Sequence, residues 1–310
     1  DYRRLEQANL LDVNIGGAEW NVAVDLSRLG ISTAWVSRLT DNALGRLIRN
    51  KAREQGVDTS HIVWTKGDRI GIYFVEFGAT PRPSSVLYDR AHSSISQVKP
   101  GEITWEKVFQ GARWFHTSGI TPALSSSAAQ VTAEALQVAK KAGCKVSYDL
   151  NYRARLWTEE EARKCQEPLM EYVDMLFSTE EDTRKVLGIT GKDYREVAQK
   201  LAEKFKFEVV CITLREDISV LRNRWTAIAC ADGKIYDDRT YDVEIVDRVG
   251  AGDSYTAGFI YGYLTGDVAK GVKYGNAYSA LKHSMPGDTN WATLSEVENL
   301  LKGGGLRISR

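Results

Sequence analysis

The spacing of apolar residues along the chain alternates between a helical and an extended period. In residues 21–30, Val22, Leu26 and Leu29 recur at nearly helical intervals, and Gly30 follows as a helix stop. The short run STAWVSRL predicts a strand, and the helical period returns in residues 41–56. This alternation predicts an α/β fold, with a doubly wound, mostly parallel sheet flanked by helices. After residue 111 we expect strands within 112–120, 145–151, 174–179 and 208–214, and helices within 125–143, 158–173 and 194–205.

Residues 69–96 break this rhythm. The runs GIYFVEF and SSVLYDRA have a β-type composition and are separated by a segment with two prolines. They predict antiparallel strands in a small sheet that projects from the main body as a lid. We therefore expect a single domain over residues 1–310, with lid strands at approximately 8–17 and 69–96. A hairpin is expected around Asp232-Gly233, followed by a strand within 241–246.

The composition narrows the possible classes of function. Hydrophobic residues make up 43% and charged residues 26% of the 310 positions, which predicts a folded core. The 41 basic and 41 acidic side chains balance, so no net charge draws the protein to nucleic acid or to an anionic membrane. No apolar run reaches the ~18–20 residues that span a bilayer. The four cysteines form no C-x-x-C pair, which argues against a zinc site and favours a reducing, cytoplasmic location.

Candidate chemistry concentrates in DRVGAGDSYTAGFIYGYL, residues 247–264. An acid, Asp253, directly follows a Gly-Ala-Gly turn and begins an apolar helical pattern. The free N–H groups of a helix start, with glycines that let a ligand approach the backbone, make an anion site. Asp253 could there accept a proton from a hydroxyl while the amides of Gly250, Ala251 and Gly252 hold a phosphate. An acidic helix cap after a glycine turn is the alternative, and this short pattern alone does not decide between the two.

Two separated motifs together make the functional prediction more specific than either motif alone. DRVGAGD resembles the C-terminal signature of the ribokinase-like (PfkB) carbohydrate kinases, D-T-x-G-A-G-D, with Arg248 in place of threonine. The N-terminal signature of that family, a Gly-Gly followed by Asn and a helix, is matched by GGAEWNVAVDLSRLG at residues 16–30. The resemblance covers nearly the whole chain and implies an ATP-dependent sugar kinase of ribokinase-like fold. Such proteins open with a central strand, and we expect this chain to begin after it.

The resemblance also implies roles for matching residues. Asp253 would be the general base, and residues 250–252 would supply the anion-hole amides. Magnesium is expected because it neutralises nucleotide phosphates. The family's N-x-x-E element, which organises that metal, corresponds to FSTEEDTRKVLG, where Thr179 and Asp182 replace Asn and Glu and Glu180 is a neighbouring metal candidate. The residues expected at the nucleotide are Thr179, Thr213, Arg215 and Asn276.

Four further segments indicate the sugar. LYDRAHSSISQVKPGEI, WFHTSGITPALS, YDLNYRARLW and KHSMPGD resemble the family members that phosphorylate 2-keto-3-deoxygluconate on its terminal hydroxyl to give the 6-phosphate. That substrate is a sugar acid, and arginine binds a carboxylate through its planar fork. The expected substrate contacts are Gly17, Asn21, Tyr73, Tyr88, Arg90, Arg153 and Asp288.

Two alternatives stay open at this point. The first is a kinase of the same fold that acts on a neutral sugar such as fructose or ribose. The second is a catalytically silent relative that binds a sugar or a nucleotide. In each case the partners are small molecules rather than nucleic acid or membrane. The projecting lid also offers edge strands for pairing between copies, so a homo-oligomer is expected.

Overall fold

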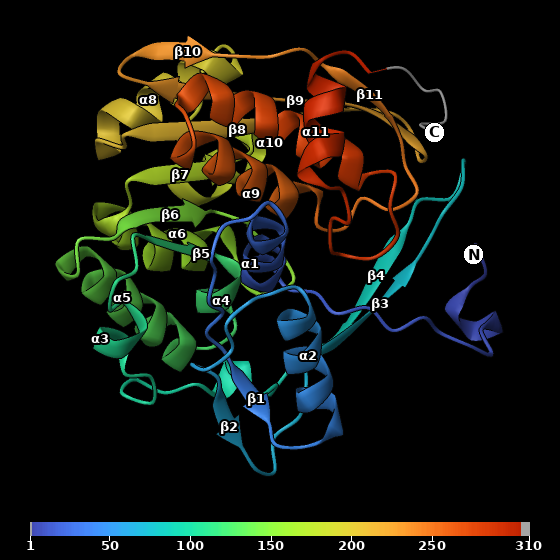
Figure 1. Cartoon of the computed structure of the whole chain (residues 1–310), viewed down its shortest axis with the longest axis vertical. Helices are drawn as coiled ribbons and strands as arrows, with labels where there is room; N and C mark the ends of the chain where they lie inside the picture. The colour runs from blue at the N-terminus through green and yellow to red at the C-terminus, as the bar shows by residue number, and fades with distance from the viewer. Residues whose placement is uncertain (1, 305–310) are drawn as a thin grey trace.

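The computed structural model describes residues 2–304. A mixed sheet of seven strands forms its centre, in the spatial order β10-β9-β8-β7-β6-β5 with β11 also paired to β9 (Figure 1). Strands β5 to β8 are mutually parallel, whereas β9 runs antiparallel to β8, and β10 and β11 run antiparallel to β9. The predicted α/β sheet is thus confirmed, with an antiparallel edge. The strands are β5 (Trp114–Ser118), β6 (Lys145–Asp149), β7 (Met175–Ser178), β8 (Val209–Ser219), β9 (Arg222–Ala231), β10 (Lys234–Tyr236) and β11 (Tyr241–Glu244).

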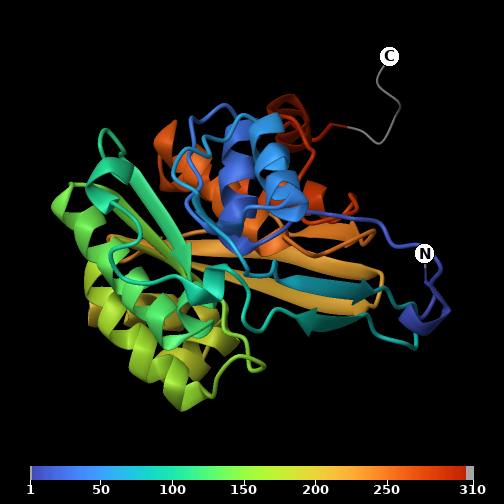
Figure 2. The same cartoon turned by 90° about the horizontal axis from the view of Figure 1, so that it is seen from below.

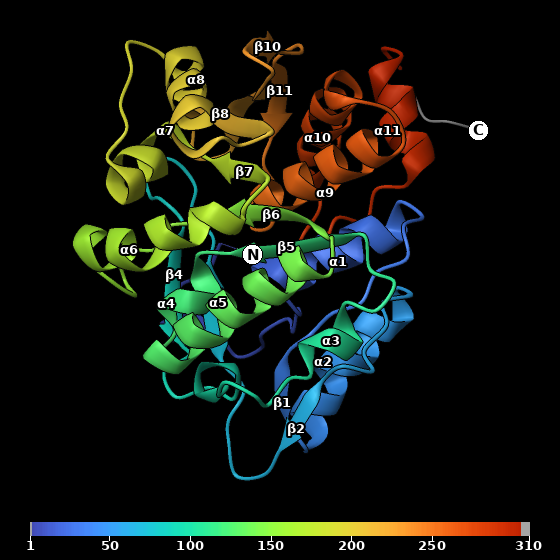
Figure 3. The same ribbon diagram turned by 90° about the vertical axis from the view of Figure 1, so that its left-hand side faces the viewer.

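Helices cover both faces of the sheet (Figure 2). Figure 3 shows the same three layers from the side, with α1 and α9–α11 opposite α5, α6 and α8. One layer consists of α1 (Ala18–Arg28), α9 (Ala251–Leu264), α10 (Val268–Lys282) and α11 (Leu294–Leu301), and the other of α5 (Ser126–Lys141), α6 (Glu159–Gln166) and α8 (Tyr194–Phe205). The shorter helical segments are η1 (Leu5–Gln7), η2 (Ile95–Gln97), α3 (Trp105–Val108), α4 (Ile120–Ala123), η3 (Glu167–Tyr172), α7 (Glu180–Asp182) and η4 (Thr183–Leu187).

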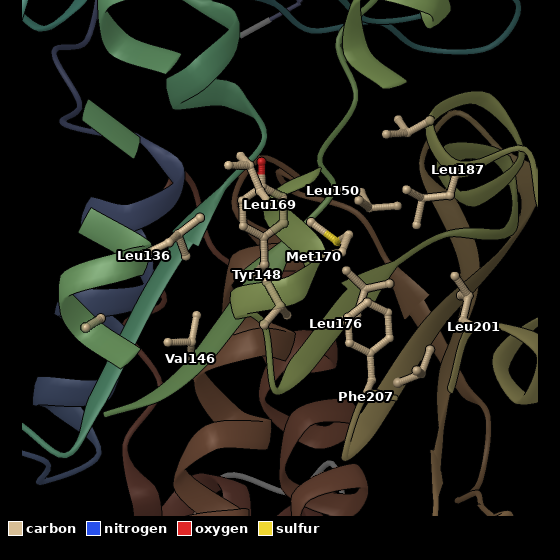
Figure 4. Packing of buried hydrophobic residues seen from close by; sticks show 14 of the residues in the cluster. Leu136, Val146, Tyr148, Leu150, Leu169, Met170, Leu176, Leu187, Leu201 and Phe207 are labelled. Atoms are coloured by element: carbon tan, nitrogen blue, oxygen red, sulfur yellow. The ribbon is translucent and has the colours of Figure 1, made fainter. Parts of the chain in front are cut away.

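The strands feed two separate cores because successive side chains point to opposite faces. On β7, Leu176 packs toward α5 and α8, whereas Met175 and Phe177 pack toward α9 and α10. Figure 4 shows the first of these cores, in which Tyr148 of β6 is surrounded by aliphatic side chains from helices and strands. Burial on both faces explains why these strands read as continuous apolar runs in the sequence.

Two small sheets lie outside the central one. β1 (Arg38–Thr40) and β2 (Val63–Thr65) form a parallel pair beside α2 (Ala43–Glu54). β3 (Ile72–Glu76) and β4 (Ser85–Asp89) form the antiparallel pair expected within 69–96, and they project from the body next to the N-terminal segment (Figure 1).

Several expected boundaries need correction. Residues 8–17 form no strand, since the described structure gives them no pairing partner, and Leu10 and Val13 are exposed. The strand expected at 32–39 is reduced to β1. The helix expected through 173 ends as an α-helix at Gln166 and continues as a tighter turn around Pro168, whose ring opposes α-helical hydrogen bonding.

The hairpin around Asp232-Gly233 is confirmed. Both residues have positive φ, 49° and 71°, as a two-residue turn between twisted strands requires. No helix among residues 2–304 is long and apolar enough to cross a membrane.

Helices α9 and α10 approach each other closely through glycines. A Cβ added at Gly258 would lie 2.9 Å from the Cα of Gly275, and one at Gly262 would lie 2.8 Å from the Cα of Gly271. Larger side chains would therefore separate the two helices. Because α9 begins at the G-A-G-D motif, this contact fixes where the motif lies.

Candidate active site

A large cavity lies at the carboxyl ends of β5 to β8, between the lid and the start of α9. Its volume is about 1400 Å³, and it continues beyond the site toward Trp105 and Phe109. Ligands of doubly wound sheets bind at this edge. Most of the residues predicted from the sequence line it, namely Gly17, Asn21, Tyr73, Tyr88, Arg90, Arg153, Thr179, Asp182, Thr213, Arg215, Gly250, Ala251, Gly252, Asp253 and Asp288.

Asp253 lies in the first turn of α9, where the chain is tightly constrained. Gly250, the residue before the helix, has a φ of 80°, and a Cβ there would lie 2.1 Å from the carbonyl oxygen of Asp288. No other residue fits this turn without displacing the loop. Gly250 therefore brings the first amides of α9 and the Asp253 carboxylate to the same corner of the cavity.

Asp253 belongs to a hydrogen-bonded group that joins α1, α9 and the lid. The Nδ2 of Asn21 donates to Oδ2 of Asp253 at 2.6 Å and approaches Oδ2 of Asp288 at 3.4 Å. The hydroxyl of Tyr73, on lid strand β3, donates to the Asp288 carboxylate at 2.6 Å. Tyr73 thereby connects the lid to the residue that packs against Gly250.

The surroundings of Asp253 favour a carboxyl group that exchanges its proton near neutral pH. Removal from bulk water raises its pKa to about 7, against the opposing effect of the Asn21 hydrogen bond. The nearby charge of Asp288 raises the pKa further, whereas that of Arg153 lowers it. A carboxylate with a pKa near the working pH is suited to general base catalysis.

Two of the predicted arginines, Arg90 and Arg153, line the cavity near each other. Arg90 stacks on the ring of Tyr88, with its guanidinium carbon 4.1 Å from the ring centre. Burial and then the positive charge of Arg153 lower the pKa of Arg90, so the two cations lie near each other. A third arginine, Arg155, was not predicted; it donates to the backbone oxygen of Val86 at 2.9 Å and ties this loop to lid strand β4.

Two predicted residues lie outside the cavity lining. Glu180 is exposed at the start of α7, whose cap is the Thr179 side chain accepting from the Asp182 amide at 3.0 Å. Asn276 is fully buried in α10, where its Nδ2 donates to the carbonyl of Ala227 on β9 at 3.2 Å. The structure therefore places Glu180 and Asn276 outside the cavity lining, and their roles at the metal and the nucleotide stay predictions.

Two further carboxylates line the cavity close to each other, Asp182 and Asp149, and the latter was not predicted. Asp149 ends β6, and burial followed by the charges of Asp253 and Asp182 raises its pKa to about 8. Within residues 2–304 no three acidic, histidine or cysteine side chains form a ready-made metal cluster. Oxygen donors suit Mg²⁺, so these two acids fit an ion whose other ligands come from a nucleotide.

Glu19 is another acid of the site that sequence reasoning missed. Its Oε1 accepts from the amide of Ser118 at 3.0 Å and from the Thr121 hydroxyl at 2.9 Å. These bonds fasten the start of α1 to the end of β5. The sequence signal for Glu19 was its position in AEW, directly after Gly-Gly at the expected start of a helix. An acid in the first turn of a helix can accept hydrogen bonds from donors on a neighbouring segment.

Residues 3–293 match the pfkB family of carbohydrate kinases. The chain therefore belongs to this family, with the ribokinase-like fold, and it is a carbohydrate kinase. It is 39% identical to a 2-dehydro-3-deoxygalactonokinase of Haloferax volcanii over 99% of this chain and 93% of that protein.

Solved structures of carbohydrate kinases are also similar to this chain. That of 2-dehydro-3-deoxygluconokinase from Thermotoga maritima has a TM-score of 0.95 and 46% identity, covering 98% of this chain and 95% of that one. A more distant structure from E. coli, which contains ATP and Mg²⁺, shares the fold with a TM-score of 0.85 and 19% identity over 97% of this chain and 93% of its own.

Behind the site lies a buried acid, Asp25, one helical turn after Asn21. Its Oδ2 accepts from the Ser254 hydroxyl at 2.7 Å, and its Oδ1 accepts from the amide of Asn290 at 3.1 Å. Burial, with a smaller contribution from the charge of Asp253, raises its pKa to about 8 despite these hydrogen bonds. Asp25, as a neutral acid, thus holds together α1, Ser254 in the first turn of α9 and the loop after Asp288.

We expect the Asp25→Asn variant to lose less stability than the wild type as the pH rises from about 5 to about 8. The pKa of this acid is about 8 when folded and has its ordinary value of 3.8 when unfolded. Its stabilising contribution is therefore complete below about pH 4 and is lost as the pH rises to the folded pKa, by about 1.4 kcal/mol per pH unit. Thermal unfolding at several pH values measures this difference. The exposed Asp12→Asn serves as the control, and identical slopes for Asp25→Asn and wild type would contradict the assignment.

Proposed function

We propose that this kinase phosphorylates a 2-keto-3-deoxy sugar acid, 2-keto-3-deoxygluconate, on its terminal hydroxyl to give the 6-phosphate. The observation that carries the proposal is the placement of Asp253 at a helix start, on one cavity with the paired cations Arg90 and Arg153. The first supports phosphoryl transfer and the second supports an anionic sugar. The names of the T. maritima and H. volcanii relatives, which specify the gluco and galacto forms of such an acid, agree with this class.

In the proposed reaction the carboxylate of the sugar binds Arg153 and Arg90. The terminal hydroxyl, at the other end of the sugar, reaches Asp253. Tyr73, Tyr88 and Asp288 contact the sugar from the lid side, and Gly17 and Asn21 contact it from the start of α1. Arg90 and Arg153 would neutralise the charge that a sugar acid brings into the cavity. A neutral sugar would leave the two guanidinium groups without an anion.

The transfer itself follows from the geometry of the α9 start. Asp253 takes the proton of the terminal hydroxyl onto its carboxylate, and the hydroxyl oxygen attacks the γ-phosphorus of ATP in line. The bond from the γ-phosphorus to the β,γ-bridging oxygen breaks, and ADP leaves. The amides of residues 250–252 hold the phosphoryl oxygens as negative charge develops. Asp149 and Asp182 would hold the magnesium ion of the ATP complex, which would neutralise phosphate charge. Thr179, Thr213 and Arg215 lie on the nucleotide side.

Closure of β3 and β4 over the sugar would exclude water, which is a competing acceptor for the phosphoryl group. The Tyr73–Asp288 hydrogen bond supports a lid that already contacts the body. A cytoplasmic location belongs to the same proposal, since ATP is the donor and the four cysteines are free thiols.

We expect Asp253→Asn to lower kcat by about 10²–10⁴-fold, because the amide cannot accept the proton. Asn21 can still donate to the new side-chain oxygen, so the melting temperature should change little. In the wild type, kcat/KM should rise with pH through about 7, since only the ionised Asp253 acts as base and its pKa is about 7. A variant that keeps the wild-type rate and pH profile would remove Asp253 from this role.

We expect ADP release to be much faster with 2-keto-3-deoxygluconate than with fructose or ribose. Arg153→Ala should raise the KM for the sugar acid by about 10- to 100-fold, as for a lost charged hydrogen bond, and leave the KM for ATP nearly unchanged. The galacto epimer belongs in the same panel and tests the stereochemistry at one carbon.

The matched control is Arg195→Ala, which removes an exposed arginine paired with Asp237 outside the cavity. Comparable rates with neutral sugars, or equal effects of Arg153→Ala on both KM values, would argue against a carboxylate site. Absence of ADP release with every sugar would indicate a silent relative.

We propose further that the protein is a homo-oligomer assembled through the outer face of the lid. Leu87 and Ile72, which expose 54% and 40% of their surface, lie diagonally across the β3–β4 pair on the face away from Tyr73 and Tyr88, and adjoining exposed apolar residues are typical of interaction surfaces. Light scattering should show a multiple of 34.6 kDa for the wild type and a smaller species for Leu87→Lys. A wild-type protein that is monomeric at high concentration would contradict this.

A further inference from the structure

Two arginines lie side by side at the nucleotide end of the cavity. Arg215 is on β8, and Arg248 is in the loop that joins β11 to α9, two residues before Gly250. Both line the cavity, as do the amides of residues 250–252. Partial burial, and then the positive charge of Arg215, lower the pKa of Arg248, which places the two cations within each other's field.

A single carboxylate serves both arginines. Oδ1 of Asp217 lies 3.1 Å from Nε of Arg215 and 3.7 Å from Nη1 of Arg248, and the second distance is too long for a hydrogen bond. Asp247 adds only a weaker field to Arg248. Two guanidinium groups that share one oxygen leave most of their N–H donors available to another anion.

Asp217 itself is held at the rim rather than within the site. It lies where the β8–β9 ladder loses register, and 55% of its side chain is exposed. The buried amide of Asn223, in the orientation that its hydrogen bonds require, donates to Oδ1 of Asp217 at 3.0 Å. Asn223 of β9 therefore holds the half-exposed Asp217 carboxylate within reach of the arginines.

We propose that Arg248 and Arg215 together bind the polyphosphate chain of the nucleotide, and that Asp217 occupies them until the polyphosphate displaces it. The guanidinium fork matches phosphate oxygens, and a polyphosphate supplies the charge that one exposed carboxylate does not. Arg248 stands where the family signature has threonine, so this chain adds a cation beside its anion hole. The proposal rests on ATP being the phosphoryl donor in the proposed function.

The two residues should act in opposite directions on nucleotide affinity. Loss of Arg248 removes a charged contact, whereas neutralising Asp217 removes the anion that competes with the nucleotide. Binding that is equal in the ground state and the transition state alters KM and leaves kcat nearly unchanged. The sugar KM should not respond, because Arg90 and Arg153 form the site for the sugar acid.

The experiment measures MgATP affinity by calorimetry without sugar, together with KM and kcat for both substrates. Arg248→Thr should weaken MgATP binding about tenfold or more, Arg248→Lys should weaken it less, and Asp217→Asn should strengthen it severalfold. Inorganic tripolyphosphate should compete with ATP for the wild type more strongly than for Arg248→Thr. Arg224→Thr is the control, since that exposed arginine pairs with Glu216 and Asp242 outside the cavity lining.

Unchanged affinity in Arg248→Thr, with a wild type that binds MgATP, would overturn this inference and leave the proposed function standing. Weaker binding in Asp217→Asn would overturn the displacement by showing that Asp217 positions the arginines. A wild type that neither binds MgATP nor releases ADP would instead overturn the proposed function. If Arg248→Thr does not fold, the sign of the Asp217→Asn effect still decides.

Discussion

The site depends on how the first turn of α9 is held by α1. Asn21 and Asp25 lie one helical turn apart on α1, and they reach the adjacent residues Asp253 and Ser254 of α9. The Asp25–Ser254 contact is fully buried, and the Asn21–Asp253 contact is partly buried on its Asp253 side. Removing one partner of the buried contact would leave the other polar group unpartnered. The glycine contact between α9 and α10 fixes the same helix from its other side. Asp253 is therefore positioned by packing along a whole helix rather than by a loop.

This arrangement gathers carboxyl groups whose charges oppose one another. Asp25, Asp149 and Asp253 all have a raised pKa, and in each case burial is the first cause. Arg153 is the cation that lowers the pKa of the latter two, so its occupation by an anion would raise them again. The protonation of the base and the binding of the sugar acid are consequently coupled through one guanidinium group.

The sequence predicted the sheet and the central acid because each follows from local signals. Strands that are buried on both faces appear in the sequence as apolar runs. Asp253 follows a Gly-Ala-Gly segment, and such a segment indicates a tight turn that needs glycine. The sequence did not show that Glu180 lies exposed and outside the cavity lining, because the Thr179 cap that begins this turn is a detail of side-chain geometry. Asp25 and Asp149 were missed for the opposite reason: a polar residue in an apolar pattern looks like a surface position until the packing partners are known. The short β1 could not be foreseen, since its partner β2 is chosen by tertiary contacts.

The reaction proposed here brings together two anions, and the distribution of arginines answers that difficulty. A chain with no net charge places one pair, Arg90 and Arg153, at the sugar end and another, Arg215 and Arg248, at the nucleotide end. Between them lie Asp253 and the α9 amides, where the hydroxyl and the phosphorus must meet. Each pair offsets part of the repulsion that one substrate would exert on the other and on the carboxylates that line the cavity between them. A threonine at position 248 would leave Arg215 as the remaining cation of its pair, beside magnesium and the backbone amides.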